Sequence, residues 1–169
     1  MGLLDRPSGI GYVETMKRMA ITVGFVLVFG FAGAVGFAQS DQTDIYDWET
    51  DLDVALDTAA EQDKHVFLYF AGSDWCGWCQ RLKDEILDTR QFREFSAERL
   101  VPVLIDFPRE RELPEEQQQY NRALAQQFEV SGFPTVYLVS PEREVIARTG
   151  YVRGGPANYV NQLRDAMRR

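Results

Sequence analysis

Metal-binding side chains are scarce in this sequence of 169 residues, which contains two cysteines and one histidine. A structural zinc site or a four-cysteine iron–sulfur cluster needs more of these ligands than one chain supplies. Basic side chains are also few, with 18 Lys and Arg against 26 Asp and Glu and a net charge of −8. An acidic chain repels phosphate backbones. We therefore expect neither a multi-cysteine metal site nor nucleic-acid binding.

The composition is otherwise that of an ordinary globular protein. Hydrophobic residues make up 45% of the chain and charged residues 26%, values typical of folded domains. The length allows one domain, or one domain with a short appendage. Composition and length together exclude wholesale disorder and a protein that crosses the membrane many times.

The N-terminal part carries the pattern of an export signal. Residues 20–38 contain no charged side chain, and Lys17 and Arg18 precede them closely. A basic start, a short apolar core and a small-x-small end at Ala38 are typical of a secretory signal peptide, so we predict cleavage after Ala38. The alternative is an uncleaved membrane anchor at residues 20–38, because about 18 apolar residues can span a bilayer. Both interpretations place the domain in the periplasm or on the outer face of the membrane.

The other boundaries of the chain follow from its composition. The residues that follow Met16 fit the basic start of a signal peptide better than those that follow Met1 do. We therefore predict that translation starts at Met16 and that residues 1–15 precede the true start. Residues 39–47 are polar and acidic and are expected to form a tether. Residues 48–169 are then the folded domain.

Apolar periodicity predicts alternating helices and strands in the folded domain. Helices are expected at residues 48–64, 76–89, 91–99, 115–128 and 154–168, and strands at residues 65–71, 101–107, 135–139 and 144–149. Alternation followed by two adjacent strands joined by a tight turn is typical of a mixed sheet. We therefore predict a single α/β domain with a central mixed β-sheet and helices on both of its faces.

Both cysteines lie in the run Trp75-Cys76-Gly77-Trp78-Cys79, where a predicted strand has ended and a helix begins. Backbone N–H groups and the helix dipole stabilise a thiolate at such a position. We expect Cys76 to be exposed and Cys79 to be recessed on the same side of the first turn, a pair suited to thiol–disulfide exchange. A structural disulfide and a two-thiolate metal site remain as alternatives.

The run from Phe70 to Cys79, followed by Gly132-Phe133-Pro134-Thr135, resembles the thioredoxin superfamily. It is most similar to the exported thioredoxin-like proteins of bacteria, and the resemblance covers residues 45–169. The resemblance implies a thioredoxin fold, and it implies that Pro134 forms a cis-proline loop that faces the cysteines and keeps metals away from them. Phe133 would pair through its backbone with the substrate.

The same resemblance suggests which side chains meet the substrate. Trp75, Gly77, Trp78, Phe133 and Pro134 would form the substrate-binding surface around the cysteines. Large aromatic side chains are usually core residues, so Trp75 is either buried or part of an apolar lip, while we expect Trp78 to be exposed.

The sequence departs from thioredoxin at the position of a buried aspartate that assists the second cysteine. The predicted strand has no carboxylate, and Tyr69 takes that place if one inserted residue is allowed. Water or Asp106 would then carry the proton of Cys79. Asp74, two residues before Cys76, would raise the pKa of that thiol if its carboxylate were close.

These observations lead to one function and one alternative. We predict an exported thiol–disulfide oxidoreductase, acting as a reductase on protein disulfides or dithiols through Cys76 and Cys79, with no cofactor and as a monomer. A reductase outside the membrane implies a membrane electron carrier as its partner. The alternative is a thioredoxin-like binding module with little redox turnover. The charged run 109–116 is expected to be a solvated loop or a docking surface.

Overall fold

A computed structural model describes residues 48–168 of the chain. The predicted start of translation, the signal peptide or anchor, the cleavage site and the tether lie outside the described residues. Among the helices of residues 48–168, none is both long and apolar enough to cross a membrane.

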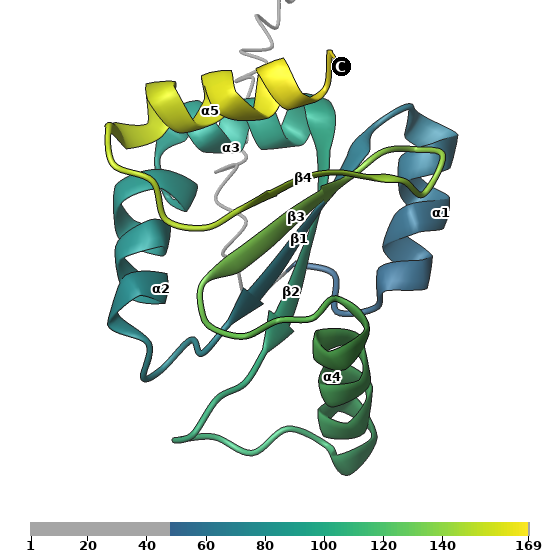
Figure 1. The fold of residues 1–169 in the computed structure, drawn as a ribbon, viewed down its shortest axis with the longest axis vertical. Coiled ribbons are helices and arrows are strands. Elements are labelled where there is room, and N and C mark those ends of the chain that lie inside the picture. The colour runs from purple at the N-terminus through teal and green to yellow at the C-terminus, as the bar shows by residue number, and fades with distance from the viewer. Residues whose placement is uncertain (1–47, 169) are drawn as a thin grey trace, which may run out of the picture. The chain divides into compact units, whose positions relative to one another are not determined.

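The described residues are built around a four-stranded mixed sheet, shown in Figure 1. Its strands lie in the order β2-β1-β3-β4, with bounds β1 (His65–Ala71), β2 (Leu100–Asp106), β3 (Thr135–Val139) and β4 (Val145–Thr149). Strand β1 pairs in parallel with β2 and antiparallel with β3, and β3 pairs antiparallel with β4. The predicted mixed sheet is therefore confirmed, and its strand bounds differ from the expected ones by no more than one residue.

Helices cover both faces of the sheet, as predicted. Helices α1 (Leu52–Gln62) and α4 (Glu115–Gln127) lie on one face. Helices α2 (Gly77–Leu82), α3 (Arg90–Arg99) and α5 (Gly155–Ala166) lie on the other, with the π-helical segment η2 (Lys83–Leu87) continuing α2. Strand β1 serves both layers because successive side chains of a strand point to opposite faces: Leu68 joins the core under α1, and Phe67 joins the core under α2, α3 and α5.

Three of the predicted helices begin later than expected, α5 by a single residue. The first helix starts at Leu52, because the carboxylate of Asp51 accepts hydrogen bonds from the backbone N–H groups of Asp53 and Val54 and so fixes the N-cap. Trp48, expected inside that helix, instead packs in the core ahead of it. The cysteine helix starts at Gly77, with Cys76 as its N-cap.

The sheet brings three separate loops to one edge. Strands β1 and β2 are parallel and end together at the pair Ala71 and Asp106, so the loops that follow them lie side by side. Strand β3 runs the other way, and its first residue, Thr135, pairs with Phe70. The cysteine motif, the charged loop after β2 and the loop that contains Pro134 therefore meet at this edge.

Candidate active site

Cys76 and Cys79 form a disulfide at the start of α2. Cys76 is held there by its backbone N–H, which donates to the carbonyl of Gly72 at 2.9 Å. Its Sγ accepts a hydrogen bond from the backbone N–H of Cys79 at 3.2 Å. Once the disulfide is reduced, this N–H and the positive end of the helix favour the thiolate form of Cys76.

Cys76 is less accessible than expected. The relative exposure of Cys76 is 7% and that of Cys79 is 2%, so both residues are buried in the disulfide form and Cys76 is only the less buried of the two. The prediction of an exposed Cys76 is wrong, because both cysteines belong to the core cluster that also contains Tyr69 and Leu82. A substrate disulfide must therefore reach Cys76 between the side chains around it.

The loop before β3 carries a cis peptide bond between Phe133 and Pro134, as the resemblance implied. The ring of Phe133 packs edge-on against Trp75 at 5.9 Å between centroids and stacks on Phe107 at 5.1 Å. Pro134 lines a groove together with Trp78. The structure thus brings together Trp75 with Phe133 and Trp78 with Pro134, although more than 50 residues separate the two segments.

Gly150, just after β4, is part of this arrangement and was missed in the sequence. A Cβ atom on Gly150 would lie 2.7 Å from the carbonyl oxygen of Pro134. A contact this short with a backbone atom leaves room for glycine only, so Gly150 lets the proline loop approach β4. No local pattern in the sequence distinguishes this glycine from the others.

Trp78 is exposed, as expected, at 50%. Its ring lies 5.3 Å from that of Tyr151, and the guanidinium of Arg81 lies 5.3 Å from its centroid. Arg81 also pairs with Glu85 at 3.0 Å, and Glu85 accepts a hydrogen bond from the Tyr151 hydroxyl at 2.5 Å. The position of Arg81 one turn after Trp78 could have indicated the contact between these two side chains, whereas nothing local indicated the contact of Trp78 with Tyr151.

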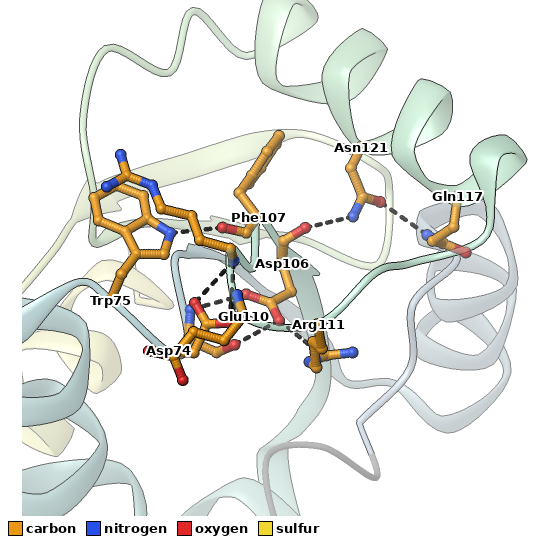
Figure 2. A network of polar contacts seen from close by, with 10 residues as sticks. Asp74, Trp75, Asp106, Phe107, Glu110, Arg111, Gln117 and Asn121 are labelled. Carbon is orange, nitrogen blue, oxygen red and sulfur yellow. Dashed lines mark hydrogen bonds and ion pairs between the residues drawn. The ribbon is translucent and has the colours of Figure 1, made fainter.

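Trp75 is 37% exposed and forms part of the surface rather than of the core. Its Nε1 donates a hydrogen bond of 2.7 Å to the carbonyl of Phe107, a contact drawn in Figure 2. The guanidinium of Arg109 lies 3.7 Å from the centre of the Trp75 ring, within the range of a cation–π interaction. Trp75 is therefore held by the loop that follows β2.

Asp74 fixes this loop from the other side. Its carboxylate accepts hydrogen bonds from the backbone N–H of Arg109 at 3.0 Å and of Glu110 at 2.8 Å (Figure 2). Desolvation raises the pKa of Asp74, but hydrogen bonds from the backbone N–H groups of Glu110, Arg109 and Asp74 itself, with the charge of Arg111, lower the pKa below its ordinary value. Asp74 is therefore ionised, and its carboxylate holds the loop by accepting hydrogen bonds from backbone N–H groups.

Asp106, the last residue of β2, is bound to a different set of partners. Its carboxylate accepts hydrogen bonds from the backbone N–H of Ser73 at 2.9 Å, from the Ser73 hydroxyl at 2.6 Å and from Arg111 at 2.5 Å. The Asn121 side chain donates to the Asp106 carbonyl at 2.7 Å. The Tyr69 hydroxyl donates a hydrogen bond of 3.3 Å to the carbonyl oxygen of Cys79. Asp106 makes no hydrogen bond with Cys79 within residues 48–168. Tyr69 therefore lies against Cys79 at the place indicated by the sequence.

A disulfide between two cysteines three residues apart at a helix start, next to a cis-proline loop on a mixed sheet, defines a thiol–disulfide oxidoreductase of the thioredoxin fold. The chain belongs to the thioredoxin-like family, because the family model described as a thioredoxin-like domain matches residues 52–166. It is 38% identical to the disulfide bond reductase DsbH of Chlamydia pneumoniae over 121 aligned residues, and this alignment covers 72% of each of the two chains. It is also 29% identical to the thioredoxin-related protein DsbJ of the same organism, over 67% of this chain and 32% of DsbJ.

Solved structures give the same result. The structure of a DsbH oxidoreductase superposes with a TM-score of 0.67 at 38% identity, covering 72% of this chain and 83% of the other. A thioredoxin from Thermus thermophilus superposes with a TM-score of 0.54 at 20% identity, covering 71% of this chain and 85% of the other. The second likeness concerns the fold alone.

Proposed function

We propose that the chain is an exported reductase of protein disulfides, with Cys76 as the attacking thiol and Cys79 as the resolving thiol. The observation that carries this proposal is the Cys76–Cys79 disulfide at the start of α2. The direction of the chemistry is inferred from the relative at 38% identity that is named a disulfide bond reductase. The location is inferred from the export signal in the sequence.

The first step is the attack of the Cys76 thiolate on a sulfur of the substrate disulfide. A bond forms between Cys76 Sγ and that sulfur, the substrate S–S bond breaks, and the second substrate sulfur leaves as a thiolate that takes up a proton. The N–H of Cys79, 3.2 Å from Cys76 Sγ, stabilises the attacking thiolate because it points at the negative charge.

The second step releases the substrate. The Cys79 thiol gives its proton to water, and the resulting thiolate attacks Cys76 Sγ. The Cys76–Cys79 bond forms, the mixed disulfide bond between Cys76 and the substrate breaks, and the substrate sulfur leaves as a thiolate that takes up a proton. Two electrons have then passed from the protein to the substrate. Tyr69 is the polar side chain that contacts Cys79 in this structure, and we propose that it orders the backbone of Cys79 while water accepts the proton.

We propose that the surface around the cysteines binds the substrate. The exposed rings of Trp75 and Trp78 lie beside Phe133 and Pro134, and Gly77, which has no side chain, follows Cys76 at the start of α2. The backbone of Phe133 would pair with an extended substrate segment. The reductase would be a monomer, and it would be reduced again by a dithiol of a membrane electron carrier.

The proposal is tested with the purified protein in an insulin-reduction assay. Wild type should reduce insulin, Cys76→Ala should be inactive, and Cys79→Ser should accumulate a mixed disulfide with substrate that dithiothreitol releases. Absence of turnover by wild type, together with capture of a partner protein that survives Cys76→Ala, would instead support a binding module.

The reduction potential of the Cys76–Cys79 pair decides the direction. A value near or below about −250 mV, measured against dithiothreitol or glutathione buffers, is expected for a reductase. A value of about −150 mV or above would contradict the proposed direction and remove the membrane electron carrier from the scheme. N-terminal sequencing of the processed protein, expected to start at Gln39, tests the export signal.

A further inference from the structure

We infer that the preferred substrates carry acidic side chains next to their disulfide, and that Arg109 and Arg153 recognise these side chains on the two flanks of the cysteines. This inference rests on the proposed function and concerns the substrate class. It follows from the distribution of charge around the site in a chain whose net charge is −8.

Most arginines of the described residues are neutralised by a neighbouring carboxylate. Ion pairs hold Arg81, Arg90, Arg93, Arg99, Arg111, Arg143 and Arg168. Five arginines of residues 48–168 have no ion-pair partner there, namely Arg109, Arg122, Arg148, Arg153 and Arg164. Of these five, Arg109 lies beside Trp75 and Arg153 beside Trp78. Both are exposed, so their guanidinium groups are available to a ligand.

The positions of these two arginines match the two aromatic flanks of the site. The guanidinium of Arg109 lies 3.7 Å from the centre of the Trp75 ring. Arg153 lines the groove that also contains Trp78, Pro134 and Tyr151. Each flank therefore offers an aromatic surface together with a cation, the combination enriched at protein interfaces.

Arg109 is fixed before a substrate arrives. The carboxylate of Asp74 accepts a hydrogen bond from the backbone N–H of Arg109, and the Trp75 ring beside the Arg109 guanidinium donates to the carbonyl of Phe107. An arginine whose guanidinium lies over a ring can still donate hydrogen bonds to a carboxylate. Because less side-chain freedom is lost on binding, such a group contributes more than a freely moving surface arginine.

The carboxylates near the site form no ion pair with Arg109 or Arg153 within residues 48–168. Asp74 directs its charge at backbone N–H groups, and Glu85 is engaged by Arg81 and Tyr151. Glu110 and Glu112 are exposed on the loop of Arg109 but form no ion pair with it. An extended substrate lying along Phe133 and Pro134 would present its neighbouring side chains to Arg109 on one flank and to Arg153 on the other. Acidic side chains fit both positions by charge complementarity.

Three synthetic peptides test the inference. Each contains the same intramolecular disulfide, flanked by glutamate, glutamine or lysine, and each is mixed with the pre-reduced protein in 0.15 M salt, where the overall negative charge of the chain is screened beyond about 8 Å. We expect the second-order rate constant of peptide reduction to follow the order glutamate, glutamine, lysine. Arg109→Gln and Arg153→Gln should each lower this rate constant for the glutamate peptide by about two- to fivefold. The double variant should remove the preference for glutamate over glutamine.

Two controls separate the possible results. Arg168→Gln removes one charge at the end of α5 and should leave the order of the peptides unchanged, and Arg153→Lys should retain part of the preference. Equal rates for the glutamate and glutamine peptides, or a preference that survives in the double variant, would overturn the inference while leaving the reductase function intact. Failure of wild type to reduce any of the peptides, or insulin, would overturn the proposed function itself.

Discussion

Substitution of Gly72 by alanine should displace Trp75 from its place beside the disulfide. A Cβ atom on Gly72 would lie 2.4 Å from Cε2 and 2.5 Å from Nε1 of the Trp75 ring, whereas ordinary contact begins at 3.4 Å. The ring must therefore move away by about 1 Å, a distance that follows from the spacing of ordinary van der Waals contacts. It cannot do so freely, because Phe107, Arg109 and Phe133 hold it from other sides.

The cost of this displacement follows from the contacts that are lost. The hydrogen bond from Trp75 Nε1 to the Phe107 carbonyl contributes about 0.5 to 1.5 kcal/mol. The cation–π contact with Arg109 contributes about 0.5 to 1 kcal/mol, and the edge-on contact with Phe133 about 0.5 to 1.5 kcal/mol. Alanine restricts the unfolded chain and returns about 0.4 to 1 kcal/mol. We expect Gly72→Ala to lower the free energy of unfolding by about 1 to 3 kcal/mol.

The measurement is urea unfolding of the oxidised protein followed by far-UV circular dichroism, with insulin reduction measured in parallel. Gly132→Ala is the matched control for stability, because a Cβ at that glycine meets no atom within 4 Å. Gly72→Ala should be less stable than this control and should show a raised KM, since Trp75 has left the substrate-binding surface. If the two variants unfolded within about 0.5 kcal/mol of each other, the usual range for neutral surface substitutions, the role assigned to the Trp75 contacts would be refuted.

Three further predictions concern other parts of the molecule. Gly150→Ala should push back the carbonyl of Pro134, lowering stability by about 1 to 3 kcal/mol and lowering insulin turnover; unchanged turnover would contradict the role of this loop. Tyr159 is fully buried, and burial raises the pKa of its phenol. Its hydroxyl lies near the Thr149 side chain but makes no hydrogen bond of good geometry within residues 48–168. Tyr159→Phe should therefore raise the free energy of unfolding in urea by about 1 kcal/mol, and a loss would show that Thr149 binds this hydroxyl. The pKa of Asp74 is lowered in the folded protein, so ionised Asp74 stabilises the fold at a pH above its ordinary pKa of 3.8. This stabilisation disappears as the pH falls through the lower pKa of the folded protein. The stability difference between wild type and Asp74→Ala should therefore shrink below about pH 4, and a difference that grows there would contradict the argument.

Most of the fold could be predicted because its elements carry local signals. Strand β1 is a continuous apolar run and is buried along nearly its whole length, which is what a central strand requires. The π-helical turn at Lys83–Leu87 interrupts the predicted cysteine helix, and apolar spacing does not reveal such a turn. The first helix begins later than the apolar pattern indicated, because the side chain of Asp51 caps it just before Leu52.

The chemistry of the site could be predicted from the sequence, because the two cysteines at this spacing and the distant Phe133–Pro134 pair each lie within one short segment. The accessibility of Cys76 and the contacts of Asp74 could not be predicted in this way. Both depend on contacts between segments far apart in the chain: the packing of the disulfide in the core, and the hydrogen bonds from Arg109 and Glu110 to the Asp74 carboxylate. The same holds for Gly150 and Arg153, which reach the site because β4 ends at the edge of the sheet where the cysteines lie. A one-dimensional pattern records which groups exist, whereas their mutual distances arise when the sheet is assembled.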